Sequence, residues 1–242
     1  MSKEILKERP LVSIAIPCYN KEPYVHRCIN SVLSQSYKNI EVFFIDDCST
    51  DNSVKIAETF NDKRLKIIKH TINSGTPAKA LNYSLDNSVG DYWMYISGDD
   101  YLDLDSVLTL LVNIEDNDYI YGDLCLVNAN NRFLKRWEYR DLTNDQIIRL
   151  IYESGGRGVV PLTGLWRTEL IQCVGWSDID HSDDTMTSIK ACQFNWKRRH
   201  IDYDFYFYRH HEGQITNNLE RREKALKKIC DYIEENYEYA IS

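Results

Sequence analysis

The sequence lacks several features that define common classes of protein. Its 242 residues contain no run of about 18 apolar residues, so no membrane-spanning helix is predicted. Basic residues are outnumbered 29 to 37 by acidic ones, and the net charge of −8 argues against general nucleic-acid binding, which needs a basic face. The first ten residues have no apolar core, and we do not expect a signal peptide there.

Cysteine is present without the spacing of a metal or disulfide framework. No two cysteines form a Cys-x-x-Cys pair, so a zinc site is not expected. An odd number of scattered cysteines is typical of reduced, mostly buried thiols. We therefore expect a cytoplasmic protein, and contact with the inner membrane surface stays open. The cysteines are Cys18, Cys28, Cys48, Cys125, Cys173, Cys192 and Cys230.

Apolar runs and amphipathic segments alternate through the first half of the chain. Such β-α-β-α order predicts an α/β fold with a doubly wound, mostly parallel sheet. The second half is less regular, with a predicted hairpin, two helices, a strand and a terminal helix. No linker or repeat separates the halves, which predicts a single domain over 1–242. The expected parts are 11–115, a smaller half over 116–215 and a C-terminal helix over 219–238. Strands are expected at 11–17, 40–45, 65–68, 92–96 and 200–208, a hairpin at 118–139, and helices at 24–35, 51–60, 78–88, 104–114, 143–153, 182–193 and 219–237.

Two of the predicted strands end abruptly in adjacent carboxylates. One run ends in Asp46-Asp47 and the other in Asp99-Asp100. Ligands of open α/β sheets bind beyond the carboxyl ends of the strands, so the two acidic ends are expected to meet in one crevice. Carboxylates beside a phosphate-bearing ligand indicate a divalent cation with oxygen ligands. For Asp47, capping of the next helix is an equal alternative, whereas Asp103 and Asp105 are better placed than Asp99 and Asp100 to cap theirs.

Four segments together resemble the family-2 glycosyltransferases of GT-A fold. They are Val12-Ser-Ile-Ala-Ile-Pro-Cys-Tyr-Asn20, Ser31-Val-Leu-Ser-Gln-Ser36, Ile45-Asp-Asp-Cys-Ser-Thr-Asp51 and Ser97-Gly-Asp-Asp100. The resemblance implies an inverting transferase that uses a nucleotide-diphosphate sugar, probably a UDP-sugar, with Mn²⁺ or Mg²⁺. It makes the first half the nucleotide-sugar-binding half and the second the acceptor-binding half. The donor-binding residues it implies are Pro17, Tyr19, Asn20, Asp47, Lys79 and Asp99, with Asp100 on the metal.

Lys79 marks a departure from that family. Members often carry Ala-Arg-Asn after an Asn-x-Gly, but this chain has Ala78-Lys-Ala80 after Asn73-Ser-Gly75. Whether Lys79 replaces the arginine at the diphosphate or sugar stays open.

The second half continues the resemblance through its charged residues. Asp183-Asp184 stands where the family has its Glu-Asp pair, which implies Asp184 as the general base, with Asp183 as the competing choice. The segment Tyr208-Arg-His-His-Glu-Gly-Gln214 resembles the family's Tyr-Arg-x-His-x-x-Gln and implies that His211 touches the diphosphate or metal. An inverting transfer needs such a base to take the proton of the acceptor hydroxyl. The implied acceptor is a glycan or a lipid-linked glycan.

For several residues in this half the sequence allows two roles. Arg157, in the glycine-rich stretch 155–158, either clamps a phosphate or is a solvated loop residue. One of Trp166, Trp176 and Trp196 is a candidate sugar platform, although core packing is expected for at least two. The apolar stripe of the terminal helix is either core or a subunit contact, which leaves a homodimer open. Its lysines 224, 227 and 228 are compatible with peripheral membrane contact, diluted by neighbouring glutamates.

Two rival functions are weaker. A sugar nucleotidyltransferase usually carries a glycine-rich basic loop after the first strand, and here that loop has one lysine and no glycine. A catalytically inactive nucleotide-sugar-binding protein is disfavoured because Asp47, Asp99, Asp100 and Asp184 are all present.

Overall fold

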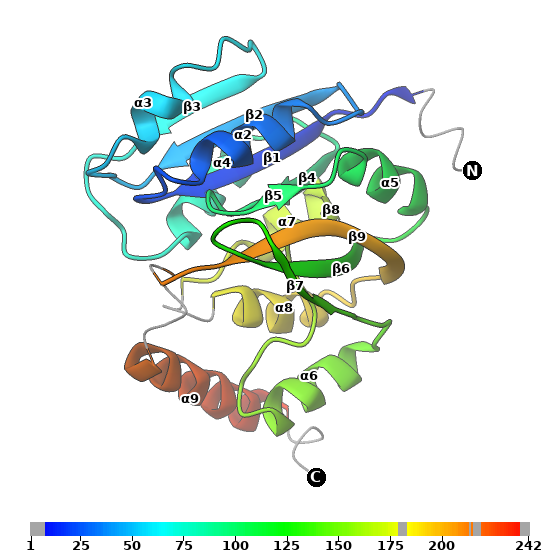
Figure 1. The fold of residues 1–242 in the computed structure, drawn as a ribbon. Helices are drawn as coiled ribbons and strands as arrows, with labels where there is room; N and C mark the ends of the chain where they lie inside the picture. Colours follow the sequence, from blue (N-terminus) through cyan, green and yellow to red (C-terminus); the bar gives the residue numbers. More distant parts are fainter. Residues whose placement is uncertain (1–7, 179–182, 213, 215–218, 238–242) are drawn as a thin grey trace.

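One mixed sheet runs through the molecule and carries helices on both faces (Figure 1). The computed structural model describes residues 8–178, 183–212, 214 and 219–237. The strand order is β3-β2-β1-β4-β8-β6-β9-β5, with β7 paired to β6. The strands are β1 (Val12–Cys18), β2 (Ile40–Asp46), β3 (Leu65–Lys69), β4 (Tyr92–Tyr95), β5 (Tyr101–Leu102), β6 (Tyr119–Asn128), β7 (Phe133–Trp137), β8 (Leu165–Arg167) and β9 (Arg198–His210). The helices are α2 (Val25–Leu33), α3 (Ser53–Ala57), α4 (Ala78–Asn87), α5 (Ser106–Asn113), α6 (Asn144–Glu153), α7 (Thr168–Val174), α8 (Asp183–Gln193) and α9 (Leu219–Asn236).

The first four predicted strands form the parallel part of the sheet. β3, β2, β1 and β4 pair in parallel in that order. Every residue of β1 and β2 is buried, as expected for strands covered on both faces. The predicted α/β fold is confirmed. In the second half β6 and β9 pair in parallel, and β8, β5 and β7 join antiparallel.

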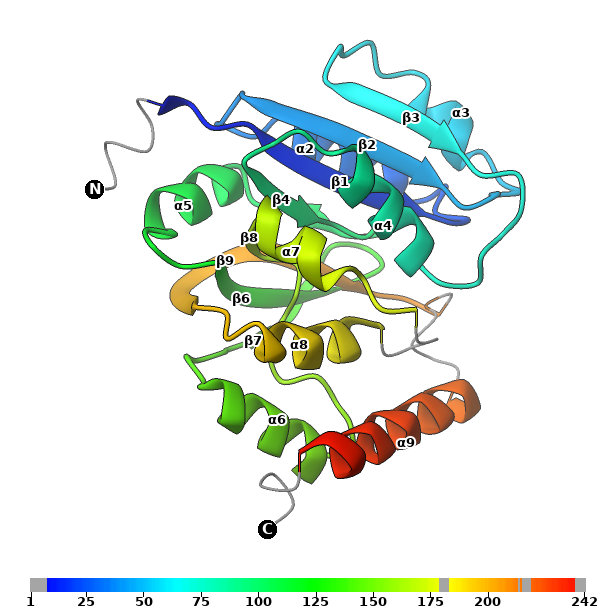
Figure 2. The ribbon, with the colours of Figure 1, turned by 180° about the vertical axis from the view of Figure 1, so that it is seen from behind.

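The two faces of the parallel strands are covered by different helices. Because successive side chains of a strand alternate, Ile14 and Ile16 enter the core beneath α2 and α5, whereas Ala15 enters the core beneath α4. On β4, Met94 joins the first core and Trp93 the second. Figure 2 shows α4 and α7 on the face opposite to α2. Because these strands are parallel and packed on both faces, their carboxyl ends lie at one edge of the sheet.

The terminal helix α9 packs on the rest of the chain through its apolar stripe. Ala225, Ile229 and Ile233 are buried, and α9 lies beside α6 in both views (Figures 1 and 2). Of the two readings of this stripe, the core reading is confirmed. The stripe therefore gives no support to a subunit contact.

Most predicted elements are present with shifted ends. Helix α3 ends at Ala57 rather than at residue 60, and β9 is longer than predicted. The strands β5 and β8, of two and three residues, and the helix α7, of seven residues, were not predicted, because segments this short carry little readable periodicity. The predicted start of α8 at Ser182 lies outside the described residues.

The structure also describes the cysteines and the length and character of the helices. All seven cysteines are free, and four of them are buried. Among the described residues no helix combines the length and the apolar character needed to cross a bilayer.

Candidate active site

Backbone hydrogen bonds hold the ends of three parallel strands together. The Asp47 N–H donates to the Cys18 carbonyl at 2.8 Å, and the Gly98 N–H donates to the Pro17 carbonyl at 3.1 Å. A Cβ on Gly98 would lie only 3.3 Å from Cys18 Sγ and from the Pro17 carbonyl oxygen, so glycine suits this close approach. The two acidic strand ends therefore flank the end of β1, as the sequence predicted.

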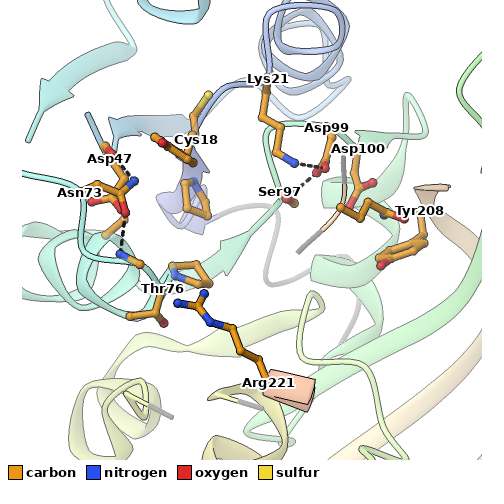
Figure 3. Close-up of a pocket in the computed structure, with 16 residues that line it drawn as sticks. Cys18, Lys21, Asp47, Asn73, Thr76, Ser97, Asp99, Asp100, Tyr208 and Arg221 are labelled. Atoms are coloured by element: carbon orange, nitrogen blue, oxygen red, sulfur yellow. Dashed lines mark hydrogen bonds and ion pairs between the residues drawn. The ribbon is translucent and has the colours of Figure 1, made fainter. Parts of the chain in front are cut away.

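A pocket of about 290 Å³ opens at this edge (Figure 3). Among its lining residues are five of the predicted site residues: Pro17, Tyr19, Asp47, Asp99 and Asp100. We call it the donor pocket. Tyr19 is 40% exposed, so its ring is available for a planar ligand. Its other walls come from the loop before α4, from Tyr208 and Gln214, and from Arg221 of α9.

Two predicted donor residues lie outside the lining of this pocket. The Asn20 side chain accepts from the Thr50 N–H at 2.8 Å and so joins the end of β1 to the turn after β2. Lys79 is exposed on the first turn of α4, between the buried Ala78 and Ala80. The cations that do line the pocket are Lys21 and Arg221. The roles given to Asn20 and Lys79 stay predictions that this geometry does not favour.

Asp47 forms hydrogen bonds with the loop that makes one wall of the donor pocket. Its Oδ2 accepts from the Ser74 N–H at 2.9 Å and from the Ser74 hydroxyl at 2.8 Å. Its Oδ1 lies 3.1 Å from His70 Nδ1, and its carbonyl accepts from the Asn73 side chain at 2.9 Å. A carboxylate has about four acceptor positions, so these contacts leave room for about one further donor such as the N–H of a base.

Asp99 is buried among three hydrogen-bonding partners. Its Oδ2 lies 2.6 Å from Lys21 Nζ and 3.0 Å from His211 Nε2, and its Oδ1 accepts from the Ser97 hydroxyl at 2.6 Å. Burial by itself would raise the pKa of Asp99, but the hydrogen bond from His211 and the charge of Lys21 together hold it below its usual value. Asp99 is therefore an ionised carboxylate fixed in one orientation.

Asp100 is held by β9. Its Oδ2 accepts from the Tyr206 hydroxyl at 2.6 Å and its Oδ1 from the Arg209 N–H at 2.7 Å. The side chain of Arg209 donates to the Asp99 carbonyl at 2.6 Å and lies over the ring of Tyr24. Burial, and then the charge of Asp99, raise the pKa of Asp100 well above its usual value. An ionised Asp100 therefore needs a cation beside it.

The side chains at this site fit a divalent cation only if a bound ligand supplies further oxygen atoms to it. Within the described residues, no group of three or more His, Cys, Asp or Glu side chains is arranged to hold a metal ion. Each oxygen of Asp100 accepts one hydrogen bond, which leaves one lone pair on each. Mg²⁺ needs only one or two carboxylates when phosphates and water supply its other ligands. The nearest recorded partner of His211 is Asp99 rather than Asp100.

A second cleft, of about 670 Å³, meets the donor pocket at Asp100. The two hollows share Ser97, Asp100, Tyr208 and Gln214. Asp184 lines the second cleft, which we call the acceptor cleft, and is exposed toward it. Its other walls contain aliphatic, polar and aromatic side chains, and the aromatic ones include Trp137, Tyr139 and Tyr206.

The two carboxylates at the start of α8 have different partners. Asp183 Oδ2 accepts from the Trp176 indole N–H at 2.9 Å, whereas Asp184 Oδ1 accepts only from its neighbour Thr185, at 2.7 Å, among the recorded bonds of the described residues. Burial, and then the charge of Asp184, raise the pKa of Asp183 to about 7. Asp184 is open to the cleft on one side, but the protein packed around its other sides removes water from it and also raises its pKa. The pair therefore titrates together and above the usual range of a carboxyl group.

The three tryptophans considered as sugar platforms are all core residues. Trp166 and Trp196 stack at 4.9 Å inside the second core, and Trp176 packs against Trp93 at 5.9 Å. Trp137 of β7 lines the acceptor cleft instead. Sequence reasoning missed it because β7 has an irregular exposure pattern, and it missed Lys21, Arg209 and Arg221 because their partners are distant in the chain.

Comparison with known proteins identifies the family. A model described as glycosyl transferase family 2 matches residues 13–168. Relatives include an uncharacterised glycosyltransferase of Haemophilus influenzae, 33% identical over 178 residues, covering 72% of this chain and 69% of that protein. Glycosyltransferase GlyG of Streptococcus pneumoniae is 27% identical over 239 residues, covering 93% of this chain and 77% of that one.

Solved structures agree on the fold. Staphylococcus aureus TarS residues 1–349, in complex with UDP-GlcNAc, superposes with a TM-score of 0.68 at 23% identity, covering 86% of this chain and 60% of that one. The mannosyltransferase PcManGT of Pyrobaculum calidifontis, in complex with GDP-Man and Mn²⁺, gives 0.58 at 20% identity, covering 86% and 62%. The chain thus spans about 60% of these structures. With a GT-A fold and a family match over more than half its length, the chain belongs to glycosyl transferase family 2.

Proposed function

We propose that the protein is an inverting glycosyltransferase that moves a sugar from a UDP-sugar to a hydroxyl of a glycan or lipid-linked glycan. The observation that carries the proposal is the meeting of two hollows at Asp100. The donor pocket is lined by Tyr19 and Asp47, and the acceptor cleft is lined by Asp184. A nucleotide-diphosphate donor is also supported by the UDP-GlcNAc and GDP-Man present in the two solved structures.

The residues divide the chemistry between the two hollows. Asp47 accepts an N–H of the base, and Tyr19 stacks on the base. Asp99, kept ionised by Lys21 and His211, accepts from the ribose or sugar hydroxyls. Asp184 takes the proton of the acceptor hydroxyl as its oxygen attacks the anomeric carbon from the acceptor side. The carbon–oxygen bond to the diphosphate breaks on the donor side, which inverts the configuration.

Negative charge develops on the leaving diphosphate in a site that already contains carboxylates. Asp100 would hold Mn²⁺ or Mg²⁺ together with the diphosphate oxygens, and the ion would stabilise the charge on the leaving group. Lys21 and Arg221 line the same pocket and add positive charge beside it. His211 orients Asp99 in this proposal, in place of the direct metal contact implied by the family resemblance.

Donor binding can be tested by thermal stabilisation. A ligand that binds only the native state raises the melting temperature. We expect UDP to raise it in the presence of Mn²⁺ and to do so less without the ion, and we expect GDP, CMP and dTDP to have smaller effects. A larger shift with GDP would transfer the proposal to a GDP-sugar, and the absence of any shift with all four nucleotides would contradict it.

The carboxylate pair predicts how transfer depends on pH. The base must be ionised, and the pKa of Asp183 is raised to about 7 beside Asp184. The pKa of the proposed base Asp184 is itself raised, so we expect kcat/KM to rise with pH above about 4 and to level off once both carboxyl groups are ionised, above about 7. Because the raised pKa favours the protonated pair in the folded state, its contribution to stability is present below about pH 4 and is lost as the pH rises through about 7. A profile that is flat from about pH 4 to about pH 8.5 would exclude this pair as the base.

A further inference from the structure

The loop that carries Arg157 is built into the wall of the acceptor cleft. A Cβ on Gly156, whose φ is +88°, would lie 2.5 Å from the Leu226 carbonyl oxygen of α9. A Cβ on Gly158 would lie 3.0 Å from the Thr185 hydroxyl of α8. The two glycines thus let the loop pass closely between α9 and the residue after Asp184. Arg157 therefore stands between a contact with α9 and a contact with α8.

Hydrogen bonds at the end of α6 fix the backbone of this loop. The Gly156 N–H donates to the Ile151 carbonyl at 2.7 Å. The Ser154 hydroxyl accepts from the Arg157 N–H at 3.2 Å and lies 3.1 Å from the Arg157 carbonyl. These bonds give the loop a defined path. Arg157 is therefore presented to the cleft from an anchored backbone.

A second arginine enters the same cleft from α9. Arg222 lines the acceptor cleft with Arg157 and Asp184, whereas its neighbour Arg221 lines the donor pocket, as Figure 3 shows. Neither Arg157 nor Arg222 forms an ion pair with any residue that the structure describes. Two guanidinium groups thus line a cleft whose other walls are largely apolar, together with the carboxylates of Asp100 and Asp184.

The charge of α9 is uneven along its length. Residues 220–228 include five basic and two acidic side chains, whereas 229–236 include three acidic and no basic ones. The basic end is the one that reaches the two hollows. Arg222 of this basic end lines the acceptor cleft and Arg221 lines the donor pocket, so in a chain of net charge −8 these two arginines favour anionic ligands at the two hollows.

We propose that the acceptor carries a phosphate or phosphodiester group close to the hydroxyl that is glycosylated, and that Arg157 and Arg222 bind this group. The inference rests on the proposed function and specifies the class of its acceptor. Guanidinium groups bind phosphate oxygens in a bidentate way, which fixes both the position and the orientation of the acceptor. Held there, the neighbouring hydroxyl faces Asp184 across the cleft.

A membrane surface is the competing partner for these basic residues. Lys224, Lys227 and Lys228 line a separate hollow on α9 together with Arg221 and Asp231. Arg157 and Arg222 instead lie inside a concave cleft that contains Asp184. A planar bilayer does not enter such a cleft, so these two residues favour a discrete phosphate on the acceptor.

The proposal can be tested by binding, independently of turnover. The protein is first saturated with UDP and Mn²⁺, which blocks the donor pocket and measures UDP affinity separately. It is then titrated by calorimetry with a glycerol phosphate tetramer, with uncharged tetraglycerol and with phosphatidylglycerol vesicles. We expect the tetramer alone to bind. Arg157→Gln and Arg222→Gln should each weaken its binding by about tenfold and leave UDP affinity within about twofold of the wild type.

A control substitution decides whether a loss of tetramer binding is specific to the two arginines. Lys63→Gln removes one positive charge from the exposed loop before β3, far from α9 in both views (Figures 1 and 2), and should leave tetramer binding unchanged. Equal binding of tetraglycerol, no binding of the tetramer to the UDP-loaded protein, or binding to vesicles alone would each overturn the proposal. A loss of UDP affinity in the arginine variants would assign these residues to the donor. If UDP itself does not bind, it is the proposed function that fails.

Discussion

Asp184→Asn is expected to lower kcat by about 10²–10⁴-fold, the usual contribution of a general base. The amide cannot accept the proton of the acceptor hydroxyl, yet it preserves the size of the side chain. Asp184 lines the acceptor cleft and not the donor pocket, so UDP affinity should be unchanged. Steady-state transfer assays and UDP titrations measure the two quantities separately.

Asp183→Asn is the matched control for this variant. Asp183 accepts from the Trp176 indole, and an asparagine retains an oxygen for that bond. We expect a smaller loss of kcat, with a shift of the pH profile because the neighbouring charge is removed. If Asp183→Asn abolishes transfer while Asp184→Asn does not, the two roles must be exchanged. Full activity in both variants would remove the pair from the mechanism.

Asp100→Asn is expected to abolish the dependence of UDP binding on Mn²⁺ and to reduce transfer by at least about a hundredfold. The amide is a neutral and weaker ligand for a hard cation than a carboxylate. Asparagine has the shape of aspartate, so the Tyr206 hydroxyl and the Arg209 N–H keep a neighbour of similar size. Calorimetric titration of UDP with and without Mn²⁺ measures the effect.

Asp100→Ala gives a less interpretable result than the sequence alone would indicate. From the sequence, we expect this variant to lose transfer and keep its fold. The structure shows that alanine would leave two buried donors, Tyr206 Oη and Arg209 N, without their acceptor. Each such loss costs about 1–3 kcal/mol, so the melting temperature must be measured alongside activity. Mn²⁺-dependent UDP binding that persists in a folded Asp100→Asn protein would contradict the metal assignment.

The positions of the acidic strand ends could be predicted before the fold was known. A buried strand shows itself as an apolar run, and its end is marked where polar residues begin. Because the carboxyl ends of parallel strands lie at one edge, Asp47 and Asp99 were expected beside Pro17 and Tyr19, and they are. Patterns that repeat along the chain are readable without knowledge of distant contacts.

The orientation of single side chains could not be predicted in this way. Lys79 lies in the segment that the family resemblance marks for the donor, but its turn of α4 directs it to solvent between two buried alanines. Lys21 reaches Asp99 across 78 residues, and Tyr206 reaches Asp100 across 106. No local period encodes such pairs, because they depend on how β9 and the loop after β1 pack together.

The amino-acid sequence by itself determined the α/β architecture, the family resemblance and the edge of the sheet at which the site lies, since these follow from local periodicity and from strand ends. Only the tertiary structure decided that Lys21 rather than Lys79 lines the donor pocket, that the candidate tryptophans are core, and that Asp184 shares a cleft with two arginines. The physical reason is that these relations arise from the tertiary packing of β9, α8 and α9, where the contacting residues are far apart in the chain.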